Sequence, residues 1–409
     1  MKSIFQSSTF RAFKNRNYAL FFCGQSVSQI GTWMQKTAVV WVIYSLTHSA
    51  FMLGLAVFAQ QFPSFLFSLL GGIVADRYSR YKILLVTQTA SMIQATLLAV
   101  LILTNHYVIW EILTLGFILG TINAFDVPAR QPMVHEMVND RADITNALAL
   151  NSAMVNIARI IGPAVSGIIL QRFGAGICFS LNALSFVAVL TSLLLLKLPE
   201  FVHPAVKKRV TEELAEGFEY LRQTPSIGVI ILLVTFMSLL VIPYDTILPI
   251  FAKIIFHGNA ATFGYISSVM GFGAIIGSLY VESVKKEADL RTIMLVSIGI
   301  LGTGLILFSH MTDFGFAIPF ALLIGFGSLI PFSISITIIQ VEATPTMRGR
   351  AMSYIAMSFF GMLPIGSLLV GVVSQKIGAP DTMFCQGILA VLVAIIFSKF
   401  VVRTKKYIG

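Results

Sequence analysis

Long apolar stretches alternate with short polar stretches along almost the whole chain. Most of the apolar stretches are near the 20 residues that an α-helix needs to cross a bilayer. They do not alternate between apolar and polar residues at a period of two, so they do not fit the strands of a transmembrane barrel. The pattern predicts an all-α polytopic membrane protein with twelve spanning helices, at about residues 17–46, 50–75, 83–103, 109–125, 146–171, 176–196, 227–252, 263–281, 291–308, 318–339, 350–373 and 382–402.

Prolines change the predicted course of two of these helices. Pro128 and Pro132 follow the fourth apolar stretch, and proline lacks the N–H that the interior of a helix needs. We expect them to end that helix near residue 125 and to leave residues 133–138 as a separate short helix on the membrane surface. Pro243 and Pro249 are expected to break the seventh helix in the same way.

The chain has two similar halves. An offset of 204 residues aligns Gly-Ile-Ile-Leu-Gln-Arg-Phe-Gly at 167–174 with Gly-Val-Val-Ser-Gln-Lys-Ile-Gly at 371–378. Several matches in one register argue for duplication, and paired six-helix halves with substrate between them are an arrangement of secondary transporters. The predicted organisation is a cytoplasmic tail at 1–16, a first half at 17–196, a cytoplasmic linker with an amphipathic helix at 197–224, a second half at 225–402 and a cytoplasmic tail at 403–409.

Composition and charge support a membrane location. The chain is 56% hydrophobic and 11% charged, with a mean hydropathy of +0.86, whereas a soluble domain carries about 25% charged residues. The net charge of +10 does not indicate nucleic acid, because most of the 28 Lys and Arg residues fall on one side of the predicted topology. Basic loops stay in the cytoplasm. We therefore expect a bacterial inner-membrane protein with both termini in the cytoplasm.

The sequence offers little that an enzyme would use. It lacks the Gly-x-x-x-x-Gly-Lys-Ser/Thr loop of nucleotide-driven pumps. Its six histidines and three cysteines have no metal-ligand spacing, and no catalytic histidine or carboxylate pair is evident. We expect no enzymatic activity, no cofactor and no metal, and a transport process that an ion gradient drives, most simply a proton gradient.

Three charged residues fall inside predicted spans: Lys36, Arg159 and Asp245. A charge inside the bilayer is costly, so each is a candidate functional residue. Lys36 and Asp245 both lie toward the outer ends of their helices, and we predict that they attract each other and help to close an outer gate. Two plainer explanations remain, because Lys36 can extend its amine to the interface and a proline kink can expose Asp245.

Arg159 keeps its charge in any environment, so it needs an acid, a phosphate, a carbonyl or a substrate anion beside it. The sequence leaves these choices open. Lys36 and Arg159 together favour a cavity for anionic or catecholate-like substrates. Further polar groups of the predicted cavity are Gln29, Asn123 and Asn156. Gln29, Gln35, Asn123 and Asn182 all add polar groups to the spans, and most of these four are expected to hydrogen-bond between helices.

A charged turn follows the second apolar stretch. Gly71 and Gly72 lack a Cβ, which lets another helix approach closely, and the turn continues with Asp76, Arg77, Arg80 and Lys82. Glu282 begins a weaker copy in the second half, and charges at other cytoplasmic turns are Asp126, Arg130, Glu342, Arg348 and Arg350. We expect these charges to form an inner gate that closes in the outward-facing state and parts in the inward-facing state. The alternative is a set of solvated loop charges.

These motifs resemble a known family. The turn is similar to the Gly-x-x-x-Asp-Arg-x-x-Arg-x-Lys loop between helices 2 and 3 of the major facilitator superfamily, and Gly162-Pro163 with Gly167 resembles its helix-5 antiporter motif, for which simple helix packing is the alternative. Gln29-x-Gly31, Asp126-Val-Pro-Ala-Arg130 and Arg348-Gly-Arg350 resemble the transmembrane secretion-effector branch, to which the enterobactin exporter and macrolide efflux proteins are similar. The resemblance implies the twelve-helix fold, rocker-switch alternating access and proton-coupled export. Because Glu282 replaces the aspartate and no arginine follows it directly, we expect an asymmetric inner gate.

The prediction is a monomeric exporter in the lipid bilayer that exchanges an amphipathic small molecule, a siderophore or a drug, for protons. Nucleic acid is not an expected partner. The alternatives are a lysolipid flippase, a proton-coupled uptake symporter and a membrane sensor that does not transport.

Overall fold

Helices account for almost all the regular structure in the computed structural model, which describes residues 8–138, 140–197, 210–284 and 288–403. No strand occurs within these ranges. The helices of the first part of the chain are η2 (Ser8–Lys14), α1 (Arg16–Thr47), α2 (Ala50–Arg77), α3 (Arg80–Leu103), α4 (Ile109–Glu136), α5 (Arg141–Phe173) and α6 (Ala175–Leu194). Those of the second part are α7 (Val210–Gln223), α8 (Pro225–Phe236), η3 (Met237–Val241), η4 (Ile242–Ile247), α9 (Leu248–Ile250), η5 (Phe251–Ile255), α10 (Ala260–Ser283), α11 (Leu290–Ser309), α12 (Phe314–Glu342), α13 (Arg348–Ile377) and α14 (Ala379–Arg403).

Eleven helical stretches of the described chain are long and apolar enough to cross a membrane, with α8 to η5 counted as one stretch, Pro225–Ile255. The remaining expected span is α1, a helix of 32 residues whose buried face includes Gln25, Ser28 and Gln35. These polar residues lower its hydropathy but not its length. The predicted all-helical, polytopic fold is therefore confirmed.

The fourth span is longer than the prolines suggested. Helix α4 continues through Pro128 and Pro132 to Glu136, so the separate surface helix expected at 133–138 is wrong. Proline deprives the carbonyl four residues earlier of its helical partner, and for Pro128 this carbonyl belongs to Ala124. The Ala124 oxygen lies against the backbone of Gly71, where a Cβ would collide with it. A close contact with α2 thus accommodates the proline.

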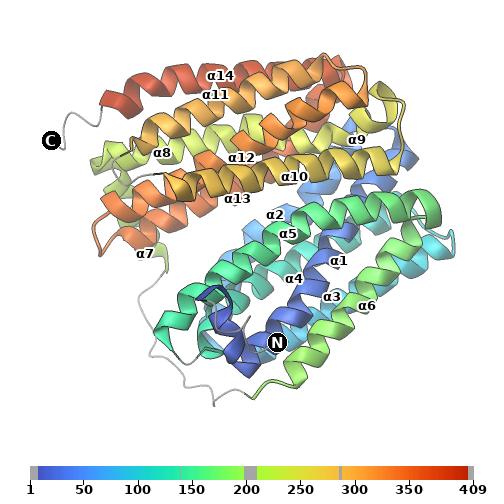
Figure 1. The fold of residues 1–409 in the computed structure, drawn as a ribbon, viewed down its shortest axis with the longest axis horizontal. Helices are drawn as coiled ribbons and strands as arrows, with labels where there is room; N and C mark the ends of the chain where they lie inside the picture. Colours follow the sequence, from blue (N-terminus) through green and yellow to red (C-terminus); the bar gives the residue numbers. More distant parts are fainter. Residues whose placement is uncertain (1–7, 139, 198–209, 285–287, 404–409) are drawn as a thin grey trace. The chain divides into compact units, whose positions relative to one another are not determined.

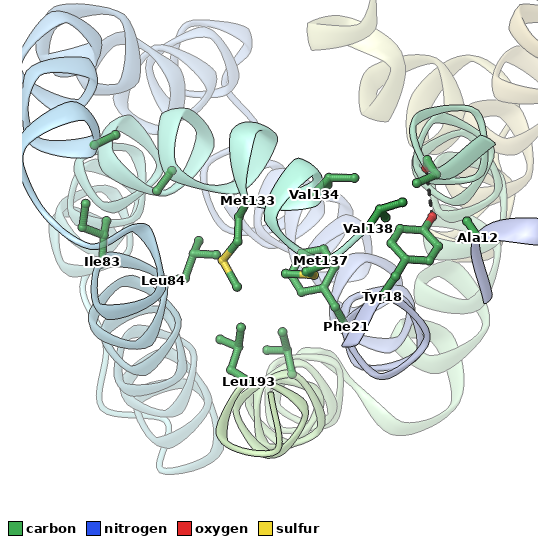
Figure 2. Packing of buried hydrophobic residues seen from close by; sticks show 14 of the residues in the cluster. Ala12, Tyr18, Phe21, Ile83, Leu84, Met133, Val134, Met137, Val138 and Leu193 are labelled. Atoms are coloured by element: carbon green, nitrogen blue, oxygen red, sulfur yellow. Dashed lines mark hydrogen bonds between the residues drawn. The ribbon is translucent and has the colours of Figure 1, made fainter. Parts of the chain in front are cut away.

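Apolar packing also extends α4. Met133, Val134 and Met137 are buried in a cluster that α1, α3 and α6 complete. Figure 2 shows the Met133 side chain beside Leu84 and Met137 beside Phe21. The predicted end at residue 125 failed because the apolar residues beyond the prolines belong to the core.

The seventh span is interrupted, as its prolines predicted. It passes from α8 through the π-helical η3, the 3-10 helix η4 and the single turn α9 to the π-helical η5. Pro243 leaves the carbonyl of Leu239 without its helical donor, and that oxygen lies against Gly366 of α13. The Gln386 side chain donates to the next two carbonyls, Leu240 at 3.3 Å and Val241 at 3.2 Å. Side chains of neighbouring helices thus supply hydrogen-bond donors to backbone carbonyls that the interrupted helix leaves without helical partners.

The described chain forms two compact units. Unit 1 contains residues 1–45 and 59–205, and unit 2 contains 46–58 and 206–409. Helix α2 is therefore shared, because its first turns belong to unit 2 and the rest to unit 1. In unit 1, α3 lies beside α4 and α6, and in unit 2, α11 lies beside α12 and α14 (Figure 1).

The duplication is visible in both units. Gly174 and Gly378, 204 positions apart in the sequence, both adopt positive φ, at 81° and 89°, where the last helix of each half begins. Glycine is favoured in such a conformation because it has no Cβ. Gly71 packs α2 on α4, and Gly277 correspondingly packs α10 against the Phe326 carbonyl of α12. Small residues bring helix backbones together at equivalent places in the two units.

Candidate functional site

Two intramembrane cations of unit 1 meet at one aromatic ring. The Lys36 Nζ atom lies 5.0 Å from the ring centroid of Trp33, and the Arg159 Cζ atom lies 5.3 Å from the same centroid. Both distances are within the range of cation–π attraction. All three side chains are half-buried. The structure thus brings Lys36 and Arg159 together and adds Trp33, which the sequence analysis did not select.

The helix-5 motif makes this arrangement possible. Gly162 is buried on α5, and a Cβ there would overlap the Cβ of Trp33 on α1. Arg159 is three residues before Gly162, on the same face of α5. Pro163 and Gly167 are also buried, and Ser166 between them donates to the Met34 carbonyl at 3.0 Å. The motif therefore fixes α5 against α1 at the level of Trp33.

A buried polar network fixes α1 from another direction. Asn182 of α6 donates to the Gln35 Oε1 atom at 2.8 Å, and Gln35 donates to Gln94 of α3 at 3.0 Å. Gln94 in turn donates to the Leu115 carbonyl of α4 at 3.2 Å. Two of the four polar residues considered for interhelical hydrogen bonds, Gln35 and Asn182, therefore form them. This network restrains the helix that carries Trp33 and Lys36, because breaking a hydrogen bond of a buried amide costs free energy.

The other residues predicted to line the cavity lie on three different helices. Gln29 lies on α1, Asn123 on α4 and Asn156 on α5, and all three are half-buried. Asn156 is one turn before Arg159. The hydrogen bonds described above do not join these three residues to the Trp33 cluster.

Asp245 lies in the interrupted seventh span. It occupies η4, between the π-helical segments, and its side chain is exposed although Tyr244 and Thr246 on either side are buried. Gly366 of α13 packs on this span through the Leu239 carbonyl and the Pro243 ring. Gly366 is 204 residues after Gly162, so the same contact between the fifth and first helices of a half occurs in both units.

In unit 1, the charges predicted to form the inner gate fall into two groups. Asp76, Arg77 and Lys82 are exposed. Gly72 is half-buried, and unlike Gly71 it meets no atom of unit 1 that a Cβ would contact, so close packing is confirmed for Gly71 and not for Gly72. Arg80 at the start of α3 forms a 2.6 Å ion pair with Glu136 at the end of α4.

Asp126 and Arg130 belong to a buried cluster rather than to a loop. They form an ion pair one turn apart on α4. The Asp126 Oδ1 atom also accepts hydrogen bonds from Thr87 at 2.8 Å and Gln88 at 2.7 Å on α3. The sequence analysis assigned both charges to a loop because it ended α4 at residue 125, and the continued helix corrects this.

Unit 2 contains a counterpart of the Arg80 pair. Arg291, at the start of α11, donates to both carboxylate oxygens of Glu342 at the end of α12, each at 2.8 Å. The same helices of each unit are therefore joined by an arginine and a glutamate at equivalent ends. This shared pair is absent from the sequence comparison of the two turns, where Glu282, which is exposed, stood in for Asp76.

The last two charges predicted for the inner gate are Arg348 and Arg350, and one of them contacts helix α7. Arg350 near the start of α13 forms a 2.5 Å ion pair with Glu216 of α7, and the Tyr220 hydroxyl accepts a hydrogen bond from the backbone N–H of Thr344 at 3.2 Å. Arg348 is exposed. Linker residues 198–209 lie outside the described residues.

Sequence reasoning missed Trp33, Glu136, Arg291 and Glu216. Three of them had a visible signal, because Trp33 is three residues before Lys36, and Glu136 and Arg291 flank apolar stretches as an acid and a base at helix ends. The signal that was missing is the pairing, which depends on how each helix is rotated about its own axis.

A contact toward the opposite ends of the helices joins the first turns of α2 to α13 within unit 2. The Ser49 hydroxyl donates to the Gln375 Oε1 atom at 2.9 Å, and the Phe51 N–H donates to the same oxygen at 3.3 Å. Gly54 and Gly371 lie at this crossing, where a Cβ on either would collide with backbone carbonyls of the other helix. The helices are thus held by small residues and a few hydrogen bonds, without an ion pair among the contacts described.

Comparison with known proteins identifies the family. The model of the transmembrane secretion effector family matches residues 7–408. The chain is 26% identical over 382 residues to the Staphyloferrin A transporter of Staphylococcus aureus, with 92% of this chain and 94% of the relative covered. It is 22% identical over 394 residues to Macrolide efflux protein A of Streptococcus pyogenes (94% and 96% covered). It is 28% identical over 335 residues to the Enterobactin exporter EntS of Salmonella typhimurium (80% and 78% covered).

Solved structures share the fold. A bacterial homologue of the human lysosomal transporter Spinster, in an inward-facing and unoccupied conformation, matches with a TM-score of 0.74 at 13% identity, covering 93% of this chain and 96% of that one. The nucleoside transporter NupG matches with a TM-score of 0.70 at 14% identity, covering 94% and 97%. The resemblance seen in the sequence is confirmed over nearly the whole chain. The protein belongs to the transmembrane secretion effector family, whose members are membrane transporters of the major facilitator type and not enzymes.

Proposed function

We propose that this transporter is a proton-coupled exporter, which exchanges an amphipathic small molecule, a siderophore or a drug, for protons across the bacterial inner membrane. Family membership and the names of its relatives, among them an enterobactin exporter and a macrolide efflux protein, support export. The distribution of basic residues supports cytoplasmic termini, and the proposed working unit is a monomer with halves at 17–196 and 225–402.

The placement of Asp245 is the observation that supports the proposal of proton coupling. It is a titratable carboxylate in a membrane-spanning stretch, and its side chain is exposed in a segment where the helix is interrupted. An ionisable residue at such a depth faces a water-filled path far more often than lipid, and π and 3-10 segments often mark hinges or functional sites. On this proposal a proton on Asp245 cancels its attraction for Lys36 and loosens the outer gate.

The test is substrate-driven proton movement in proteoliposomes that contain a pH-sensitive dye, with siderophores and cationic drugs as trial substrates. We expect wild type to dissipate the gradient with at least one substrate and Asp245→Asn to lose the signal. Asp381→Asn is the matched control, since Asp381 is exposed at the start of α14 and lies outside the proposed path. Equal signals from Asp245→Asn and wild type would remove Asp245 from the coupling mechanism.

Alternating access is proposed to use separable contacts at both ends of the helices. At the outer end, the α2–α13 crossing at Gly54 and Gly371 rests on small residues and on the hydrogen bonds of Gln375. At the inner end, the Arg80–Glu136 and Arg291–Glu342 pairs keep each half rigid. The exposed charges Asp76, Arg77, Lys82, Glu282 and Arg348 are then available to form the inner gate.

A cross-linking experiment tests the outer contact. In a background with Cys23, Cys178 and Cys385 replaced, cysteines at Ser49 and Gln375 are joined by a short bifunctional thiosulfonate reagent. We expect cross-linking to stop transport and reduction to restore it, with each single-cysteine variant unaffected by the reagent. Continued transport by the cross-linked protein would contradict opening at this contact.

A further inference from the structure

Buried oxygen atoms without hydrogen-bond partners gather around the interrupted seventh span of unit 2. Within residues 210–284 and 288–403, the buried side-chain oxygens of this kind belong to Ser238, Thr246, Ser374 and Gln386. The first two lie on the span, in η3 and η4, and the other two lie on α13 and α14, which pack against η3 and η4. The described residues of α10, α11 and α12 add none to this set. The interruption of the helix is therefore the feature that these oxygens share.

The two hydroxyl groups on the span behave differently from other hydroxyls of unit 2. A buried Ser or Thr hydroxyl in a helix commonly donates to the carbonyl one turn earlier. Thr235, on the same span, does so to the Ile231 carbonyl at 2.8 Å. The same bond is formed by Ser267, Ser278, Ser335, Thr337, Ser367 and Thr382. Ser238 and Thr246 are 0% and 1% exposed, yet their hydroxyls have no partner among the described residues, their own helix included.

Gln386 adds an acceptor at an intermediate level of the span. Its amide nitrogen donates to the carbonyls of Leu240 at 3.3 Å and Val241 at 3.2 Å. Its Oε1 atom is buried without a partner among the described residues, and the residue is 2% exposed. An amide oxygen only accepts, so its partner must be a donor. Because the two amide atoms share one carbon, Oε1 lies near the same carbonyls, between Ser238 and Thr246 along the span.

Water fits these atoms better than a metal cation. A water molecule can donate to the Gln386 oxygen, and it can both donate to and accept from a hydroxyl. A cation would bind the oxygens but leave the hydroxyl hydrogens of Ser238 and Thr246 without acceptors. The chain from Ser238 to Thr246 extends over roughly 12 Å at an α-helical rise, so one water with hydrogen bonds of about 3 Å cannot serve both. The set of atoms calls for several waters in a row.

The same segment carries Asp245. Its side chain is exposed, it directly precedes Thr246, and Ser238 lies nearer to the start of the span at Pro225. On the topology proposed above, that start is the inner end. A file of waters at these positions extends from the level of Asp245 toward the inner side. In such a file each water accepts a proton from one neighbour and donates one to the next, so a proton crosses without net change in any water.

We propose that Ser238, Thr246 and Gln386 bind a file of buried waters along the interrupted span, and that this file carries protons between Asp245 and the inner side of the membrane. The proton step rests on the proposed function, whereas the binding of water does not. The three side chains are positioning residues for the waters. The π-helical and 3-10 segments have the role of opening the helix to them, as an inserted water does in a distorted helix.

Radiolytic hydroxyl-radical footprinting of the full-length protein in nanodiscs tests for the waters directly. Radicals form from water where it is bound, and they oxidise the side chains beside it. Met237 precedes Ser238 on the span, whereas Met294 lies on α11, and the two methionines are 3% and 0% exposed. Bulk water therefore reaches neither. We expect Met237 to be oxidised several times faster than Met294, and equally slow oxidation of both would overturn the proposal.

Two substitutions remove the hydroxyls with little change in shape. Ser238→Ala and Thr246→Val leave every hydrogen bond described for the span in place. With bound water, Ser238→Ala should slow Met237 oxidation, and both variants should slow proton movement in the dye assay several-fold without raising the unfolding temperature. Without water, both variants should be more stable than wild type, because each removes an unsatisfied buried group. That result would contradict the proposal.

Thr235→Val is the matched control on the same span. Its hydroxyl is bonded within its own helix, so this variant should keep the wild-type rates of Met237 oxidation and of proton movement. A loss of proton movement as large as that of Thr246→Val would show that the effect comes from the helix as a whole and would contradict the water file.

The two assays separate this proposal from the exporter proposal. Fast Met237 oxidation that Ser238→Ala suppresses, without proton movement for any substrate, would support the waters and contradict the exporter. Proton movement that Asp245→Asn stops, and that Ser238→Ala and Thr246→Val leave unchanged, would support the exporter and contradict the file as its proton path.

Discussion

The first spanning helix of unit 1 and its counterpart in unit 2 are built on the same contact but differ in chemistry. Helix α1 is continuous, carries Lys36 and packs on Gly162 of α5. The counterpart, α8 to η5, is interrupted, carries Asp245 and packs on Gly366 of α13. The duplicated fold therefore gives one half a restrained cationic cluster and the other half a titratable acid on a distorted helix. Under the proposed function, the acid on the distorted helix is the candidate for coupling.

The largest expected effect comes from filling the glycine contact in unit 2. In Gly366→Ala, the new Cβ meets the Leu239 carbonyl and the Pro243 ring, neither of which can move without displacing the broken helix. We expect a loss of about 3 kcal/mol in the free energy of unfolding, the upper end for overpacking. Thermal unfolding in detergent measures it.

The control for this substitution is Gly299→Ala. A Cβ on Gly299 of α11 meets no atom within 4 Å in the described structure, and alanine has the better helix propensity. Its unfolding temperature should stay the same or rise slightly. Equal behaviour of the two variants would show that the α13 contact is looser than its geometry implies.

The second prediction compares the two arginine–glutamate pairs. The Arg291 and Glu342 side chains are 7% and 24% exposed, against 23% and 29% for Arg80 and Glu136. Removing one partner of a more buried pair leaves a less hydrated charge behind. We expect Arg291→Gln to cost about 2 kcal/mol and Arg80→Gln about 1 kcal/mol.

Urea or thermal unfolding of both variants measures this difference. Adding Glu342→Gln to Arg291→Gln should recover part of the loss, because the unpaired carboxylate is then neutral. If Arg80→Gln were the more damaging variant, burial would not be what sets the strength of the duplicated pair.

These pairs show what the sequence could and could not predict. The length of apolar stretches predicted the eleven helical stretches that can cross a membrane, because the bilayer thickness fixes that length. The sequence alone also identified Lys36, Arg159 and Asp245 as candidate functional residues, since a charged residue within an apolar stretch can be recognised without a structure. The partners Trp33, Glu136 and Arg291 were missed because they depend on the rotation of each helix. The end of α4 was misplaced because a tertiary contact at Gly71 accommodates Pro128, and no local rule includes that contact.

The third prediction concerns the hydrogen bonds that support the interrupted helix. Gln386→Leu removes donors from the carbonyls of Leu240 and Val241. We expect a loss of about 1 kcal/mol in stability, with faster hydrogen exchange confined to residues 237–247. Gln94→Leu, in the continuous-helix half, should leave exchange in that segment unchanged. Faster exchange throughout unit 2 would indicate instead that Gln386 supports the whole unit.

The smallest expected effect is at the linker helix. Glu216→Gln removes the ion pair with Arg350, but the Glu216 side chain is 45% exposed, and pairs at such sites contribute about 0–1 kcal/mol. We therefore expect little change in unfolding temperature. Exchange in α7 should still increase, because the Tyr220 contact with Thr344 is then the main polar bond described between α7 and the turn that joins α12 to α13. A drop in stability as large as that of Arg291→Gln would mean that α7 is an integral part of unit 2 rather than a helix docked against the first turn of α13.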